Sequence, residues 1–94
     1  MFDINDVKLT GVVLSVDGGI EVKGPYANLY LESKGKKYTE ILAISFYGDN
    51  ADRIQKEVNK GDNILIGAKL IGKRSSSTES ILLRLVGNFF FLLK

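Results

Sequence analysis

Two tyrosines are the residues of this sequence best suited to contact a ligand. Tyr30 and Tyr47 alternate with apolar neighbours in two predicted strands, so each ring points away from the apolar face of its strand. Packing does not require an aromatic ring on a polar face, whereas a planar ligand group can stack on one. Tyr26 and Tyr38 lie at strand ends and are weaker candidates. The alternative is that Tyr30 and Tyr47 pack against the N-terminal segment or a neighbouring subunit.

Basic residues form two clusters, both in segments that we predict to be loops. The clustered residues are Lys34, Lys36, Lys37, Lys73 and Arg74. Lys69, Lys8 and Arg84 project from predicted strands and would extend a track of positive charge. The formal net charge is only +2, so the clustering rather than the total indicates a polyanionic partner. For any single lysine, the simpler interpretation is a solvated surface charge.

Composition excludes several classes of chemistry. The chain contains no cysteine and no histidine, which excludes disulfides, zinc sites of the Cys/His kind and histidine general bases. Ser75, Ser76 and Ser77 have no histidine to activate them, and neither paired carboxylates nor a phosphate-binding glycine loop is present. We therefore expect no enzymatic activity, no cofactor, no metal and no small-molecule substrate.

The sequence predicts neither export nor membrane insertion. Its first residues, MFDINDVKLTG, include two acidic side chains instead of the basic and then apolar pattern of a signal peptide. No apolar run approaches the roughly 20 residues that a membrane-spanning helix needs. We expect a cytoplasmic protein that does not contact a membrane.

Apolar periodicity predicts five strands and one helix in a single domain that spans residues 1–94. The predicted strands cover residues 7–16, 26–33, 38–47, 60–74 and 81–93, and the helix lies within residues 48–61. Asp17-Gly18-Gly19 predicts a turn after the first strand, and Gly24-Pro25 lies in the loop before the second. Asp49 or Asn50 can cap the helix, and Gly61 is predicted to end it.

The predicted core combines one face of three strands with a helical stripe. Its strand residues are Ala27, Leu29, Leu31, Leu42, Ile44, Phe46, Ile64, Ile66, Ala68 and Leu70, and its helix residues are Ala51, Ile54 and Val58. Five strands with a helix between the third and fourth match the partly open Greek-key barrel of the OB-fold. We expect Gly67 to let the fourth strand bend and Gly72 to release the chain into a loop.

Two segments are apolar on both faces and predict contact between copies of the chain. In the first strand, Leu9, Gly11 and Val13 share one face, and Val12, Leu14 and Val16 share the other. In the last strand, Phe89 and Phe91 face one way and Phe90 faces the other. Exposed apolar patches of that size are unusual on a monomer. We therefore expect a homo-oligomer, most simply a dimer.

Four stretches resemble the bacterial single-stranded-DNA-binding protein family. They are LTGVV (residues 9–13), YANLYLES (26–33), SFYGDNADRIQKEVNKGDNILIGAKL (45–70) and LVGNFFFLL (85–93). The resemblance implies an OB-fold that binds single-stranded DNA without sequence preference, in replication, recombination or plasmid or phage transfer. Tyr47 matches a family position that is commonly aromatic. The family's flexible linker and acidic C-terminal tip are missing from this sequence, so we expect that mode of recruiting partner proteins to be absent.

Two other functions stay open at this point. A primosomal-type OB adaptor also resembles the family, lacks the acidic tail and binds replication partners through the same barrel. A structural oligomer with little nucleic-acid affinity would suit the modest charge and the absence of tryptophan. RNA is an alternative ligand, because a stacking platform does not read the sugar directly.

Overall fold

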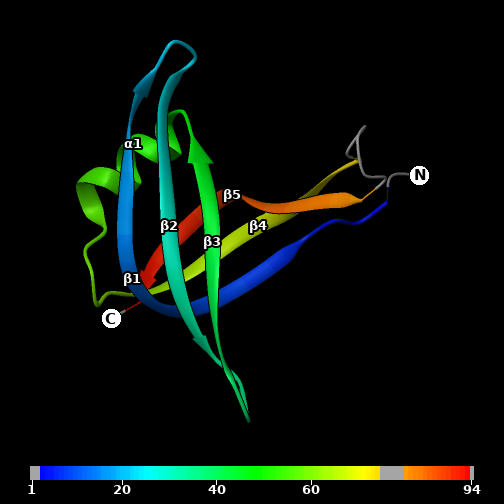
Figure 1. The fold of residues 1–94 in the computed structure, drawn as a ribbon. Helices are drawn as coiled ribbons and strands as arrows, with labels where there is room; N and C mark the ends of the chain where they lie inside the picture. The colour runs from blue at the N-terminus through cyan, green and yellow to red at the C-terminus, as the bar shows by residue number, and fades with distance from the viewer. Residues whose placement is uncertain (1–2, 75–79, 94) are drawn as a thin grey trace.

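The computed structural model describes residues 3–74 and 80–93, which form five long strands and one short helix (Figure 1). In chain order the elements are β1 (Val7–Glu21), β2 (Gly24–Lys34), β3 (Thr39–Tyr47), α1 (Asp49–Glu57), β4 (Asn63–Arg74) and β5 (Ile81–Leu93). The predicted order, with the helix between the third and fourth strands, is confirmed. The predicted polar loop at 75–79 lies outside the described residues. In the described parts of the chain, no helix has the length and apolarity to cross a membrane.

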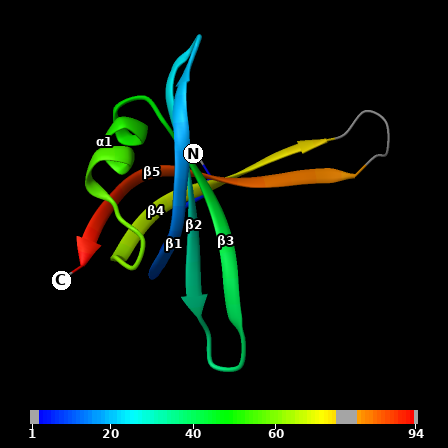
Figure 2. The ribbon, with the colours of Figure 1, turned by 60° about the vertical axis from the view of Figure 1, so that its left-hand side comes forward.

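The strands close into a barrel in the order β1-β2-β3-β5-β4. Neighbouring strands are antiparallel, except that β3 and β5 run parallel and pair only at Ile44↔Leu85 and Ser45↔Val86. β1 belongs to two ladders, since residues 7–12 pair with β4, and residues 12–21, apart from Leu14, pair with β2. The predicted five-stranded barrel is therefore confirmed. Figure 2 shows the β2–β3 and β4–β5 hairpins projecting from it in different directions.

β1 is longer than predicted, because Asp17-Gly18-Gly19 does not form a turn. The three residues continue the strand and pair with β2. A Cβ atom on Gly18 would lie 2.3 Å from the carbonyl oxygen of Tyr26, so this glycine permits the close approach of β2. Gly24 and Pro25, predicted to lie in a loop, instead begin β2, where the first residues of a strand tolerate proline.

The core contains most of the predicted residues. Its buried apolar side chains are Val13, Ala27, Leu29, Leu31, Ile44, Phe46, Ala51, Ile54, Val58, Ile64, Ile66, Ala68 and Phe90. Leu70 was a wrong prediction: its side chain is 43% exposed, because β4 leaves the barrel after Ala68. Val16 packs against the core, although the alternation placed it on the opposite face from Val13. The register shifts between Val13 and Ser15, so Leu14 is an extra residue that reverses the facing of later side chains.

The ends of α1 differ from the prediction. Gly48, with φ of 66°, occupies the N-cap position, and no side chain caps the helix there. Asn50 instead donates a hydrogen bond from Nδ2 to the carbonyl oxygen of Asn88 on β5, at 2.8 Å. The helix ends at Glu57, before Gly61, which has φ of 92° and donates its N–H to the carbonyl of Val13 at 2.8 Å. Gly61 therefore serves the connection to β4 instead of ending the helix.

A second register shift lies opposite Gly67 and Ala68, where Asn88 is the extra residue on β5. The shift falls at the predicted bend near Gly67, but a Cβ atom on Gly67 would lie 2.1 Å from the ring of Phe89. Gly67 thus makes room for an aromatic ring. The alternation of the last strand is confirmed, because Phe90 is buried while Phe91 on the opposite face is 60% exposed.

Candidate nucleic-acid interface

Tyr30 lies at the centre of the outer face that β1, β2 and β3 form together. It pairs with Ser15 on β1 and with Ala43 on β3. Directly opposed residues of neighbouring strands share one face of the sheet. Since both partners are small, neither covers the ring, and Tyr30 is half-buried among its neighbours. The face therefore presents a half-buried aromatic ring between two small side chains.

Three polar side chains beside Tyr30 tie the three strands together. Asn28 on β2 donates from Nδ2 to Oδ1 of Asp17 on β1, at 3.0 Å. Ser45 on β3 donates from Oγ to Oδ1 of the same asparagine, at 3.2 Å. These bonds hold the amide of Asn28 in one orientation and keep this part of the face polar. They also place the carboxylate of Asp17 next to the face, where its negative charge opposes the approach of a phosphate.

Tyr47 lies on the same outer face, at the end of β3 and opposite Tyr26 of β2. Its side chain is 49% exposed. The guanidinium carbon of Arg84, on β5, lies 5.6 Å from the centroid of the Tyr47 ring, and Nη2 of Arg84 donates to the tyrosine hydroxyl. Tyr47 lies four residues beyond Ala43, which is about 13 Å along the strand. Two aromatic rings thus share one face, and a cation flanks the second.

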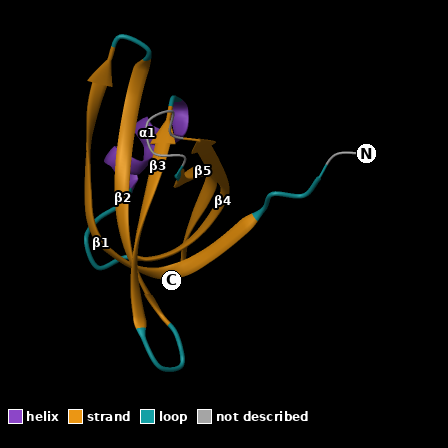
Figure 3. Cartoon of the chain, turned by 45° about the vertical axis from the view of Figure 1, so that its right-hand side comes forward, coloured by secondary structure: helices purple, strands orange, loops and turns teal. Residues whose placement is uncertain are grey.

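The first basic cluster lies at the far end of this hairpin from Tyr47. Lys34 ends β2, and Lys36 and Lys37 lie in the β2–β3 loop that Figure 3 shows in teal at the end of the hairpin. The N–H of Gly35 donates to the carbonyl of Tyr38 at 2.8 Å and closes this loop. All three lysines are exposed, and none forms an ion pair with another described residue. Their charges are therefore available to a polyanion.

The second basic cluster lies on a different projection. Lys73 and Arg74, predicted to begin a loop after Gly72, remain in β4 and pair with Leu82 and Ile81. The prediction was wrong because β5 stays paired with β4 well beyond the barrel. We call this projection the β4–β5 arm (residues 69–74 and 80–86), and it also carries exposed Lys69. Since the arm and the β2–β3 hairpin diverge, the fold does not gather the two clusters at one point (Figure 2).

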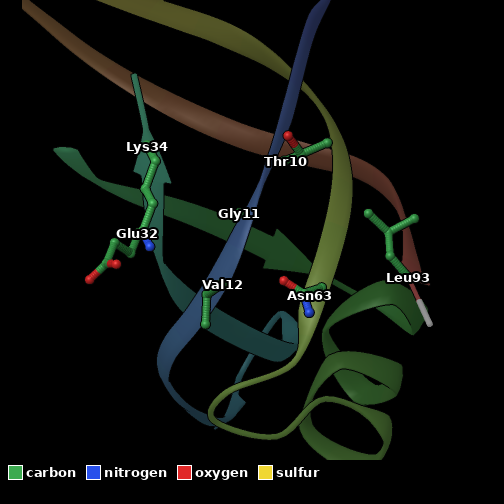
Figure 4. A pocket seen from close by; sticks show the side chains of 7 residues that line it. All are labelled: Thr10, Gly11, Val12, Glu32, Lys34, Asn63 and Leu93. Atoms are coloured by element: carbon green, nitrogen blue, oxygen red, sulfur yellow. The ribbon is translucent and has the colours of Figure 1, made fainter. Parts of the chain in front are cut away.

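A shallow depression of about 510 Å³ lies on the outside of the barrel, where β1 runs between β2 and β4 (Figure 4). Its lining residues are Thr10, Gly11, Val12, Glu32, Lys34, Asn63 and Leu93. Gly11 stands where β1 passes from β4 to β2, and a Cβ atom there would lie 2.3 Å from the carbonyl oxygen of Glu32. Tyr30, Glu32 and Lys34 alternate along β2, so they share one face. The depression mixes a carboxylate with an amine and carries no concentrated positive charge.

The basic residues of α1 are paired within the helix. Nε of Arg53 lies 3.0 Å from a carboxylate oxygen of Glu57, and Nζ of Lys56 lies 2.9 Å from one of Asp52. The hydrogen bond that Lys56 donates to the carboxylate of Asp52 raises the pKa of Lys56 above its ordinary value. These pairs neutralise most of the helix's positive charge. In residues 3–74 and 80–93, no group of three or more acidic side chains is placed to hold a metal ion.

No family model and no curated protein sequence matches the chain. Solved structures do match it over nearly its full length. The mitochondrial single-stranded DNA-binding protein of S. cerevisiae is 19% identical, with a TM-score of 0.78 and 98% of each chain covered. The chain has the fold of single-stranded DNA-binding proteins. The Plasmodium falciparum protein, solved in complex with single-stranded DNA, is 19% identical, with a TM-score of 0.78, and the match covers 100% of this chain and 98% of that one. The corresponding domain of a Synechococcus protein is 15% identical, with a TM-score of 0.74 and coverage of 96% and 97%.

Sequence reasoning missed two groupings within this OB-fold. The hydrogen bonds of Asn28 were not predicted, because Asp17 was assigned to a turn and not to a strand beside β2. The contact of Arg84 with Tyr47 was also missed, since it joins residues that are 37 positions apart. One signal was present, because Asn28 and Ser45 stand on the polar faces of adjacent predicted strands.

Proposed function

We propose that the chain binds single-stranded DNA without sequence preference, on the outer face of β2 and β3. One observation carries the proposal: Tyr30 and Tyr47 share this face, with basic side chains at each end of it. Lys34, Lys36 and Lys37 lie beyond Tyr30, and Arg84 lies beside Tyr47. The fold, and the single-stranded DNA in the Plasmodium structure, support this choice of ligand.

In the proposed mechanism, bases stack on the tyrosines and phosphates lie against the lysines. Stacking tolerates any sequence, because every base has a π-face. Arg84 moves from the hydroxyl of Tyr47 to the phosphate of the nucleotide stacked there. Lys69, Lys73 and Arg74 extend the positive track along the β4–β5 arm. RNA can stack in the same way, so oligomers of equal length, one DNA and one RNA, should be titrated side by side.

The β2–β3 loop should set the salt dependence of binding. Changing Lys36 and Lys37 together to glutamine should reduce the slope of log affinity against log salt concentration by about 1.4, since each contact with a single strand contributes about 0.7. Fluorescence anisotropy of labelled oligo-dT at several salt concentrations measures this slope. Lys56→Gln is the matched control, because it also removes a lysine, but one that lies on α1 next to Asp52. Equal slopes in the unmodified chain and the double variant would contradict the proposed track.

We also propose that the chain is a homodimer or a higher homo-oligomer. Its β1–β4–β5 face, on the outside of the barrel, carries Val12, Leu65, Phe89, Phe91 and Leu93. The rings of Phe89 and Phe91 lie 5.6 Å apart, and Phe91 is 60% exposed. A second copy would remove these rings from water, and a dimer would double the length of the binding track.

Sedimentation should give a mass of at least twice the 10.4 kDa of one chain at micromolar concentration. Phe91→Asp should return the mass to that of a single chain, because a charge in an apolar interface is costly to desolvate. Ile20→Asp changes an even more exposed aliphatic residue on the β1–β2 hairpin and should leave the mass unchanged. A mass equal to that of one chain for the unmodified protein would overturn the proposal that it is a homo-oligomer.

The biological setting stays a prediction. Replication, recombination and plasmid or phage transfer all expose single-stranded DNA in the cytoplasm, and the proposed function suits each of them.

A further inference from the structure

The β4–β5 arm has an unpaired strand edge. On one side, residues 81–84 of β5 pair with β4, from Arg74↔Ile81 to Ile71↔Arg84. On the other side, β3 meets β5 only at Leu85 and Val86, and the two strands then diverge (Figure 2). Within the described residues, no strand therefore pairs with the edge of β5 between Ile81 and Arg84. Such an edge offers backbone N–H and C=O groups to an added strand.

The same four residues expose aliphatic side chains. Ile81, Leu82 and Leu83 are 63%, 61% and 68% exposed. A cavity of about 260 Å³ adjoins them and is lined by Ile71, Lys73, Leu82, Leu83 and Arg84. Ile81, Leu82 and Leu83 lie outside the core cluster, because the arm extends away from it, whereas Arg84 contacts Tyr47 of β3. An unpaired edge beside exposed aliphatic side chains is the arrangement to which an extended peptide adds as a new strand.

The cations of the arm can contact phosphates, but the free edge of β5 is better suited to a polypeptide than to stacked bases. Its sequence from Lys69 to Val86 contains no aromatic residue, so bases find no ring on which to stack. The consecutive aliphatic side chains of Ile81, Leu82 and Leu83 point to alternate faces of the arm and can contact side chains on both faces of an added strand.

Charge distinguishes between a second copy of the chain and a different partner. Between residues 69 and 86 the sequence has four basic residues, Lys69, Lys73, Arg74 and Arg84, against a single acid, Glu79. Two arms that paired with each other would bring these like charges together. An acidic partner would be attracted instead.

The two faces of the arm also differ. Paired residues share a face, so Lys73 and Arg84 lie on one face together with Ile71 and Leu82. The other face carries Ile81 and Leu83, with Arg74 as its cation. A strand whose side chains alternate between acidic and aliphatic would direct its acids towards the more basic face and its aliphatic side chains towards Ile81 and Leu83. We propose that the edge of β5 at residues 81–84 accepts, by strand addition, an extended acidic segment of a partner protein. The proposal does not depend on DNA binding by the outer face of β2 and β3.

The probe is a capped heptapeptide of alternating valine and aspartate. Binding of the fluorescently labelled peptide is followed by anisotropy. Amide hydrogen exchange of the isotope-labelled chain then identifies the residues that the peptide covers. We expect slower exchange of the amides on the edge at residues 81–84. Leu83→Asp should weaken binding about tenfold, because it removes apolar contact and adds repulsion. Val22→Asp is the matched control, since Val22 is fully exposed at the tip of the β1–β2 hairpin, and it should leave binding unchanged.

Further peptides and one further variant separate strand addition from simple charge attraction. Methylating alternate backbone nitrogens of the peptide should abolish binding, because it removes donors to the edge, and replacing its aspartates by lysine should also abolish it. Leu83 is exposed, so Leu83→Asp should leave amide hydrogen exchange outside the arm unchanged, which shows that the variant is folded. Ile81→Asp serves as a second variant with the same expected loss of peptide binding.

Three results would overturn the proposal. The first is that the methylated peptide binds as well as the original. The second is that oligo-dT, but not the peptide, slows exchange at residues 81–84, which would make the arm a nucleic-acid surface. The third is that Leu83→Asp, without any peptide, lowers the mass of the assembly in solution. A second copy of the chain would then be the occupant of the β5 edge. Binding of oligo-dT to the same sample tests the proposed function separately.

Discussion

Replacing Tyr30 and Tyr47 together by alanine should weaken the binding of oligo-dT by about 100-fold. Each base stacked on an aromatic ring contributes roughly 1–3 kcal/mol, and about 1.4 kcal/mol corresponds to tenfold in affinity. Each single variant should therefore lose about tenfold. Anisotropy of a labelled oligonucleotide measures the loss without relying on tyrosine emission, which the substitutions themselves reduce.

The matched control keeps the rings and removes only the hydroxyl groups. Tyr30→Phe combined with Tyr47→Phe should bind within about twofold of the unmodified chain, because stacking needs the ring alone. Tyr47→Phe also removes the acceptor that holds Arg84. Unchanged affinity in the double alanine variant would show that the rings serve packing or subunit contact, and it would reject the proposed interface.

Changing Gly87 to alanine should lower the free energy of unfolding by about 3 kcal/mol, the upper end of what overpacking a core usually costs. A Cβ atom at this position would lie 2.1 Å from the ring of Phe46, which is fully buried. That ring stands edge-on to Phe90, with centroids 6.2 Å apart, so it has no free space into which to move. Urea unfolding followed by circular dichroism measures the change.

Gly67→Ala is the control for this substitution. Its Cβ atom would meet the ring of Phe89 at the same 2.1 Å, but Phe89 lies on the outside of the barrel, so in a single chain its ring can turn towards solvent. The two variants are therefore compared below the concentration at which the chain associates. We expect a loss below about 1 kcal/mol, partly offset because alanine restricts the unfolded chain more than glycine. Equal losses for the two variants would mean that the ring of Phe46 is not confined by the core.

The register shift in β1 explains where alternation failed as a guide to facing. Within β2, where no extra residue intervenes, Ala27, Leu29 and Leu31 all lie in the core as predicted. In β1 the extra residue Leu14 turns Val16 inward, and no local pattern marks it. Asp17-Gly18-Gly19 has the composition of a turn, yet position 18 requires glycine because β2 passes too close for a Cβ atom. Local composition cannot distinguish these two uses of glycine.

The candidate interface was predictable only in part. The polar facing of Tyr30 and Tyr47, and the exposure of the lysines in the β2–β3 loop, followed from alternation and clustering. The contact between Arg84 and Tyr47, and the hydrogen bonds of Asn28, depend on which residues face each other across strands. The position of Lys73 and Arg74 depends on how far β5 follows β4.

The sequence by itself determined the order of the elements, the inward side chains of the central strands and the types of residue available for binding. These properties arise from alternation and turn composition, which act over a few neighbouring residues. Only the tertiary structure decided that the two tyrosines share one face with Arg84, that the two basic clusters lie on diverging hairpins and that one edge of β5 is left unpaired. Those features depend on hydrogen-bond register between strands far apart in the chain, and a single extra residue such as Asn88 is enough to change that register.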